Sequence, residues 1–169
     1  MPTREINKTG LDLIKGFEGI LDGDPTTVNL DPYLDPVGIW TIGWGHAIMI
    51  GSEFLRGPEN KKRAYALYPG GITLAQAETL LRADVLDSCR DVESQVRVPL
   101  NDNQFAALAS FVFNVGVGNF KQSTLLRLVN QRDFIGASRE FPKWNKSNGR
   151  VLEGLTRRRA AEAALFMRP

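Results

Sequence analysis

The fold of this chain is indicated most clearly by one stretch, Lys15–His46, which reads KGFEGILDGDPTTVNLDPYLDPVGIWTIGWGH. An acid, Glu18, stands at the end of an apolar segment, and a second acid, Asp35, follows a Pro-Tyr-Leu turn. Thr41 comes six residues after Asp35, where aromatic and aliphatic residues alternate. Hydrolysis of a glycosidic bond needs one carboxyl group that protonates the leaving oxygen and another that activates water or attacks the sugar. We therefore interpret Glu18, Asp35 and Thr41 as candidate catalytic residues.

Asp31 is a rival for the second acid, because it also precedes a proline. The residue six places after Asp31 is Val37, which has no hydroxyl group. Asp22 and Asp24 lie among turn-forming residues and are more typical of turns than of a catalytic site. These differences favour Asp35.

The composition predicts a folded protein with unevenly distributed charge. The chain has 169 residues, of which 43% are hydrophobic, and this is enough for a sizeable core. The net charge is only +2, yet residues 1–35 hold seven acids and three bases, whereas residues 120–169 hold eleven bases and four acids. An acidic catalytic rim beside a basic lobe suits the attraction of an anionic polymer. The alternative for any single arginine is an ordinary solvated helix face.

Helical periodicity begins near the N-terminus. Thr9 is expected to cap a first helix, whose Leu11, Ile14 and Phe17 face the core. Gly19 is expected to end this helix.

Further along the chain, capping signals at Thr73 and Asn101 predict a long helix to about Gln95 and a nearly all-apolar helix from Phe105. The alternating segment Ile39–Ile50 predicts strands with a bend that glycine permits. Shorter helices are expected over residues 59–67, 124–130, 133–141 and 155–167. The fold class expected from these elements is α+β and mainly helical.

Several motifs resemble the phage-type lysozyme (endolysin, muramidase) family of glycoside hydrolases. They are Phe17-Glu18-Gly19, Pro32-Tyr33-Leu34-Asp35, the segment Gly38–His46, and the C-terminal pattern Gly154-Leu155, Arg158-Arg159 and Glu162. The family carries a catalytic Glu-Asp-Thr set with five residues between the Asp and the Thr, and this spacing is kept here. The Glu-to-Asp spacing is longer than in the shortest members, with the extra residues in the polar tract Asp22–Asn29. The resemblance covers the chain from about Thr9 to Phe166.

The resemblance implies a lysozyme-like fold in one domain, residues 1–169. A small N-terminal lobe with a short β-sheet would comprise residues 12–72. A larger helical C-terminal lobe would comprise residues 1–11 and 97–169, and a helix over residues 73–96 would join the two.

The implied activity is hydrolysis of the β-1,4 bond between N-acetylmuramic acid and N-acetylglucosamine in bacterial peptidoglycan, with lysis of the host cell. Glu18 would protonate the leaving oxygen, and Asp35 would stabilise positive charge on the sugar and orient or deprotonate water. The Thr41 hydroxyl would hold that water, which favours an inverting mechanism because space for water is needed between the carboxyl groups.

Three further residues are candidates for substrate binding. Asn114 belongs to a region that in the family lies along the substrate cleft, and its alternative is a helix C-cap. Tyr33 is the second candidate. His46 is the third, and its alternative is a structural, hydrogen-bonding role.

Other functions remain open. A lytic transglycosylase would use Glu18 alone as acid and then base, and a non-catalytic peptidoglycan-binding module would keep only the fold. Binding of nucleic acid is a remote alternative, because the chain has no zinc spacing, no stacking motif and no extreme basicity.

No metal and no cofactor are expected, since His46 has no further zinc ligands nearby. The single cysteine, Cys89, is expected to be a buried, reduced thiol. Trp144 either stacks on a sugar or packs into the core. One of the three arginines at 157–159 is expected to pair with Glu162 or with another internal acid.

The polar start of the chain and the lack of a long apolar run predict no stable membrane insertion. The expected protein is a monomer that waits in the host cytoplasm and acts on the wall in the periplasm or outside. Access to the wall would then need a separate pore protein, a holin.

Overall fold

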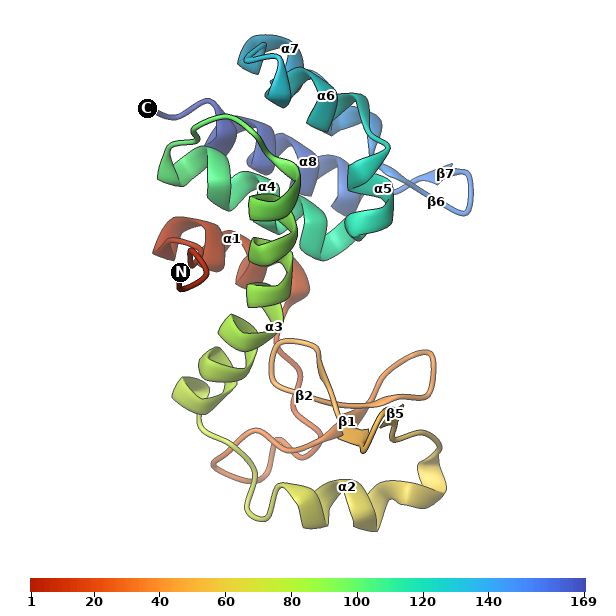
Figure 1. Cartoon of the computed structure of the whole chain (residues 1–169). Helices are drawn as coiled ribbons and strands as arrows, with labels where there is room; N and C mark the ends of the chain where they lie inside the picture. Colours follow the sequence, from red (N-terminus) through yellow and green to blue (C-terminus); the bar gives the residue numbers. More distant parts are fainter. The chain divides into compact units, whose positions relative to one another are not determined.

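The computed structural model describes residues 1–169 (Figure 1). It is mainly helical with short antiparallel strands, which confirms the predicted fold class. The chain divides into two compact units. We call Glu18–Asp84 the strand unit, and we call Met1–Phe17 together with Val85–Pro169 the helical unit. The lobe boundaries expected from the sequence stay a prediction.

The strand unit contains a three-stranded antiparallel sheet in the order β1 (Tyr33–Leu34), β2 (Trp40–Ile42) and β3 (His46–Ala47). A hairpin of β4 (Met49–Ile50) and β5 (Glu53–Phe54) follows, and then the short helices η1 (Pro58–Asn60) and α2 (Lys61–Leu67). Gly43 and Gly45 in the β2–β3 turn have positive φ angles of 63° and 76°. Glycine adopts such angles without strain, so the predicted bend is confirmed.

The core of the strand unit sets the direction of the β2 side chains. It is formed by Trp40, Ile42, Ile48, Leu55, Ala64, Ile72 and Ala77. The Trp40 indole Nε1 donates to the Gly57 carbonyl oxygen at 2.8 Å, which fixes the ring in place. Because side chains alternate along a strand, Trp40 and Ile42 face this core while Thr41 faces the opposite side of β2.

The helical unit is built from short helices around α4. Its elements are α1 (Lys8–Glu18, in this unit up to Phe17), α4 (Asp102–Val115), α5 (Val117–Lys121), α6 (Thr124–Asn130), α7 (Phe134–Ser138), η2 (Phe141–Lys143), the hairpin of β6 (Lys146–Ser147) and β7 (Arg150–Val151), and α8 (Glu153–Phe166). All residues of α4 from Phe105 to Val112 are buried, and α8 packs along this helix (Figure 1). The predicted all-apolar helix is therefore the centre of its unit.

The long helix α3 (Leu74–Gln95) confirms the predicted helix that starts at Thr73. Its capping box is complete, since Thr73 N–H donates to Gln76 Oε1 and Gln76 N–H donates to Thr73 Oγ1. The chain passes from the strand unit to the helical unit within α3, between Asp84 and Val85. Cys89 on this helix is 1% exposed, which confirms the buried thiol, and burial raises its pKa to about 11.

Two expectations for the first helix are wrong. Gly10 N–H donates to Asn7 Oδ1 at 2.9 Å, so Asn7 and not Thr9 caps α1. The Phe17 side chain is 37% exposed and does not face the core, unlike the other two residues predicted to do so. Phe17 stands in the last turn of α1, where residues 16–19 are all exposed.

The segment after α6 also differs from the prediction. The helix expected over residues 133–141 is shorter, because α7 ends at Ser138 and a separate 3₁₀ turn begins at Phe141, directly before Pro142. The β6–β7 hairpin was not expected from the sequence. Its turn residues Asn148 and Gly149 have φ angles of 49° and 75°, so the Asn-Gly pair was the signal that could have predicted it.

None of the helices combines the length and the apolar character that a bilayer crossing requires.

The packing around Phe111 predicts a large cost for its removal. The Phe111 ring is fully buried and meets Phe120, Phe141 and Trp144 edge-on, with centroid distances of 6.2, 5.5 and 5.5 Å. The last contact agrees with the packing interpretation of Trp144. We expect Phe111→Ala to lower the free energy of unfolding by ~3–5 kcal/mol, measured by denaturant titration. Ile135→Ala, at a position 59% exposed, is the control and should cost under ~1 kcal/mol. A similar small loss for Phe111→Ala would contradict the central place of α4.

Candidate active site

Glu18 is the last residue of α1 and the first of the strand unit. Gly19, with a φ of 67°, ends the helix as predicted, and it leaves the Glu18 side chain exposed. The carboxylate lies at the β2–β3 turn, because its Oε2 atom is 4.0 Å from the position that a Cβ atom would take on Gly45.

Asp35 follows β1 and is held by the backbone of the turn that leads into β2. Its Oδ1 atom accepts hydrogen bonds from Val37 N–H at 2.9 Å and Ile39 N–H at 2.8 Å. The Asp35 N–H donates to the Ile39 carbonyl oxygen, and Gly38 N–H donates to the Asp35 carbonyl oxygen. The second carboxylate oxygen, Oδ2, takes part in neither side-chain bond. The turn therefore fixes the carboxylate through one oxygen and leaves the other for a ligand.

Tyr33 on β1 is affected by the charges of both acids. Its pKa is raised, mainly by burial and then by the negative charges of Asp35 and Glu18, while a hydrogen bond with the Gly45 backbone acts in the opposite direction. Glu18 and Tyr33 thus both reach Gly45 of the β2–β3 turn, and Asp35 follows Tyr33 by two residues at the end of β1.

Thr41 stands directly opposite Tyr33 in the sheet register, so the two side chains share one face. It is 4% exposed, and its hydroxyl donates to the Ile39 carbonyl oxygen at 3.1 Å. With its proton engaged in this way, the hydroxyl oxygen can still accept a hydrogen bond from a water molecule. Ile39 connects the two candidates, since its N–H binds Asp35 and its carbonyl oxygen binds Thr41.

His46 on β3 bonds to Asp84 on α3. The His46 Nδ1 atom is 2.9 Å from Asp84 Oδ2 and 3.1 Å from Oδ1, and both side chains are partly buried. This contact agrees with a structural role for His46, because it ties the sheet of the strand unit to the first half of α3. The role of His46 in substrate binding stays a prediction.

The rival acid Asp31 has a structural environment. It is 4% exposed, its Oδ2 atom accepts from the Thr27 hydroxyl, and its backbone N–H donates to Asp22 Oδ1. A carboxylate engaged inside its own loop is poorly placed to meet a substrate, which supports the choice of Asp35.

Asn114 is in the helical unit, in the last turn of α4. Its Oδ1 atom accepts from Arg159 Nη2 at 2.9 Å, whereas the C-cap position belongs to Gly116. The C-cap interpretation is therefore wrong. Asn114 also lines an open cavity of about 440 Å³ together with Trp144 and the β6 residues Lys146 and Ser147. Its role in substrate binding stays a prediction.

The bond to Asn114 is part of a buried ionic cluster beneath α4. Glu162 is fully buried and lies 3.2 Å from Arg158 Nε and 2.8 Å from Arg159 Nε, and it accepts from the Ser110 hydroxyl at 2.7 Å. The predicted pairing of an arginine with Glu162 is thus confirmed, and two arginines take part. The sequence did not indicate that Arg159 would be fully buried, because consecutive arginines usually lie on a solvated face.

Comparison with known proteins identifies the protein family to which this chain belongs. The phage lysozyme family profile matches residues 24–162. The endolysin of Acyrthosiphon pisum secondary endosymbiont phage 1 is 39% identical over 167 residues, covering 95% of this chain and 97% of that protein. The endolysin of Bacillus phage PZA is 38% identical over 162 residues, covering 96% of this chain but only 55% of that protein, so this chain spans about half of its length.

A solved structure agrees with these relatives. A variant of P22 lysozyme superposes with a TM-score of 0.76 at 31% identity, and the match covers 98% of this chain and 99% of that one. This chain belongs to the phage lysozyme family. The family, the fold and the glycosidase class predicted from the sequence are confirmed by this membership.

The buried cluster predicts a stability difference between two glutamates on α8. Glu162→Gln would leave two arginines without their buried counter-charge, so we expect a loss of ~3–5 kcal/mol in the free energy of unfolding. Glu153→Gln removes the exposed partner of Arg157 on the same helix and should change stability by less than ~1 kcal/mol. Denaturant unfolding of both variants measures the difference, and equal effects would contradict a structural role for the cluster.

Proposed function

We propose that this chain is an endolysin that hydrolyses the β-1,4 bond between N-acetylmuramic acid and N-acetylglucosamine in bacterial peptidoglycan. The proposal is supported by Glu18 and Tyr33 both reaching the Gly45 turn, and by the Asp35 carboxylate being held at the end of the strand that carries Tyr33, in a member of the phage lysozyme family. Two carboxyl groups near each other are the minimum equipment of a glycosidase.

In the proposed reaction Glu18 is the general acid. Its position at the exposed end of α1, facing the glycine-rich β2–β3 turn, lets a bulky sugar approach the carboxyl group. Proton transfer to the glycosidic oxygen neutralises the leaving alkoxide as the bond breaks.

Asp35 stabilises the positive charge that develops on the sugar and orients or deprotonates the attacking water. Its two backbone hydrogen bonds fix the carboxylate before substrate binds, so little reorganisation is needed in the transition state. Thr41 accepts a hydrogen bond from that water, because its own proton is donated to Ile39. A water held between acid and base leads to inversion at the anomeric carbon.

Three residues are proposed to contact the glycan or its peptide. Tyr33 lies among the acids and offers an aromatic edge and a hydroxyl group, and His46 lies two strands away in the same sheet. Asn114 has its oxygen bound by Arg159, so its amide N–H groups are the part available to donate. Loss of such a contact raises KM more than it lowers kcat, and kinetics of Tyr33→Phe, His46→Gln and Asn114→Ala would test each assignment.

The assignment of the acids predicts a clear order of effects. We expect Glu18→Gln to nearly abolish turnover and Asp35→Asn to lower kcat by orders of magnitude, because each removes a charge or proton that the transition state requires. Asp31→Asn is the matched control on the neighbouring turn and should keep most of kcat. Release of reducing ends from purified peptidoglycan measures turnover, and circular dichroism checks folding. A larger loss for Asp31→Asn than for Asp35→Asn would show that the wrong acid was chosen.

The products of the wild-type digest separate the alternatives. A hydrolase leaves reducing ends, a lytic transglycosylase leaves anhydro ends, and a non-catalytic binder releases no fragments, so mass spectrometry distinguishes the three. The anomer formed first, observed by nuclear magnetic resonance, reports inversion or retention. Substantial activity of Asp35→Asn together with anhydro ends would replace the proposed mechanism by that of a transglycosylase.

We further propose that the enzyme acts as a monomer, waits in the host cytoplasm and reaches the wall through a pore made by a separate holin. The prediction is that expression of this chain alone in a bacterium leaves the culture turbid, and that expression of a holin with it causes rapid clearing. A holin expressed with the Glu18→Gln variant is the control for lysis by the pore alone. Clearing by this chain without any pore protein would contradict the proposed route.

A further inference from the structure

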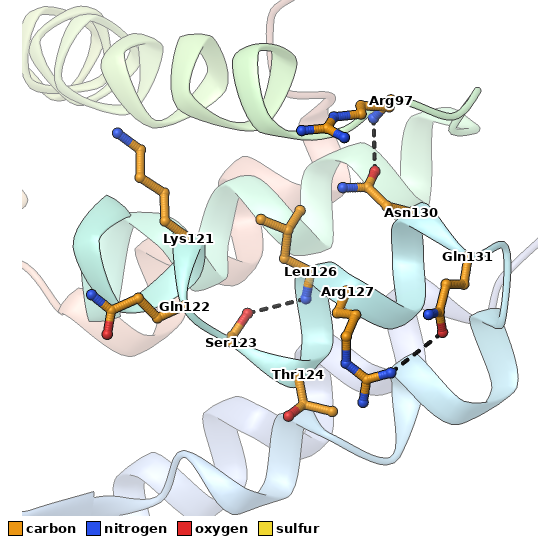
Figure 2. A pocket seen from close by; sticks show the side chains of 9 residues that line it. All are labelled: Arg97, Lys121, Gln122, Ser123, Thr124, Leu126, Arg127, Asn130 and Gln131. Atoms are coloured by element: carbon orange, nitrogen blue, oxygen red, sulfur yellow. Dashed lines mark hydrogen bonds between the residues drawn. The ribbon is translucent and has the colours of Figure 1, made fainter.

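An open, basic pocket lies in the helical unit, apart from the residues assigned to catalysis (Figure 2). Its volume is about 460 Å³, and it is formed by the segment after α3, by α5 and by α6. The lining side chains that bear on its chemistry are Arg97, Lys121, Gln122, Thr124, Leu126 and Arg127. Three of these are cations, and no acidic residue lines the pocket.

The cations of this pocket are not neutralised by carboxylates. The Arg97 guanidinium and the Lys121 ammonium group make no ion pair or side-chain hydrogen bond within the chain. Arg127 donates only to the neutral Gln131 amide at 3.4 Å. Elsewhere in the helical unit, exposed cations such as Lys143 and Arg157 bind a glutamate nearby. Three cations without a carboxylate partner around one hollow create a positive potential that an anion would lower.

The frame of the pocket is fixed by hydrogen bonds that leave the cationic groups available. Arg97 N–H donates to Asn130 Oδ1 at 2.7 Å, and Asn130 Nδ2 donates to the Gln95 carbonyl oxygen at 3.1 Å (Figure 2). One amide on α6 therefore holds the segment that carries Arg97. Ser123 is 7% exposed, and its hydroxyl group caps α6. The hydroxyl accepts from Leu126 N–H and donates to the Phe120 carbonyl oxygen, so it is not available to a ligand.

The arrangement of the cations suits an extended ligand. In Figure 2 the side chains of Arg97 and Lys121 extend on one side of Leu126, and that of Arg127 extends in the opposite direction toward Thr124 and Gln131. A single small anion would not reach all three groups at once, whereas a chain with successive negative charges could pass from one to the next. The helical unit as a whole holds 16 basic and 10 acidic side chains, so its net charge of +6 would assist the approach of such a chain.

We propose that this pocket binds successive phosphate groups of a phosphodiester-linked anionic polymer of the cell wall. Phosphate suits the site because arginine forks, a lysine and the Thr124 hydroxyl all donate to phosphate oxygens, and none of them needs a donor from the ligand. The inference rests on the proposed function only in placing the protein at the wall. Binding would keep the enzyme on its substrate between cleavage events.

Calorimetry at two salt concentrations measures how tightly the wild type and two double variants bind a synthetic glycerol phosphate oligomer. We expect Arg97→Gln/Lys121→Gln to bind about 10-fold more weakly than the wild type and to show a smaller salt dependence, because fewer counterions are released. Arg139→Gln/Arg168→Gln removes the same charge from exposed positions of the same unit and should stay within about 2-fold of the wild type. Inorganic phosphate should bind much more weakly than the oligomer.

Hydrolysis of short, phosphate-free peptidoglycan fragments is measured with the same three proteins. Equal turnover in all three keeps the pocket separate from catalysis, and a lack of turnover in the wild type would count against the proposed function without affecting the binding result. The pocket proposal is overturned if the wild type does not bind the oligomer, if inorganic phosphate binds as tightly, or if both double variants lose affinity equally.

Discussion

The backbone of Ile39 is the constraint on which the candidate site depends. Its N–H group holds the Asp35 carboxylate and its carbonyl oxygen holds the Thr41 hydroxyl and the Asp35 N–H group, directly before the strand in which Thr41 pairs with Tyr33. A side chain at position 39 is not needed for either bond. The positions of the Asp35 carboxylate and the Thr41 hydroxyl therefore depend on the five residues that separate them. In a longer or shorter turn, a different peptide group would face each of these side chains.

The position of Glu18 follows from a different constraint. A helix that stops at Gly19 leaves its last side chain exposed, and Gly45 in the β2–β3 turn leaves space in front of that carboxylate. A side chain at Gly45 would have to occupy this space, and its backbone would also be strained at a φ of 76°. The turn thus combines a backbone requirement with an opening for a ligand.

The two units carry opposite charge for separate reasons. The strand unit holds 9 acidic and 5 basic side chains, among them the acids assigned to catalysis and to the loop before β1. In the helical unit the basic residues have two uses. Arg158 and Arg159 are buried against Glu162, where they fix Asn114 and the packing of α8 on α4, whereas Arg97, Lys121 and Arg127 face a hollow on the surface. The charge of a segment alone does not distinguish these uses.

The sequence by itself determined the elements whose signals are local. The capping boxes at Thr73 and Asn101, the glycine that ends α1 and the spacing from Asp35 to Thr41 each involve residues within a few positions of one another, so their physics can be read along the chain. The misplaced cap of α1 and the missed β6–β7 hairpin are also local. There the local signals are Asn7, which is a favourable N-cap residue, and the Asn148-Gly149 pair, which favours a tight hairpin turn.

Only the tertiary structure decided which polar groups meet across long separations. The bond of His46 to Asp84 and the burial of Arg159 beside Asn114 each depend on a neighbour supplied by a distant part of the chain. The same holds for the basic pocket, whose cations come from three separate segments. Periodicity shows which face of a helix is apolar. Which distant segment packs against that face, or leaves it exposed, is decided by the packing of the whole chain and cannot be read from any single position.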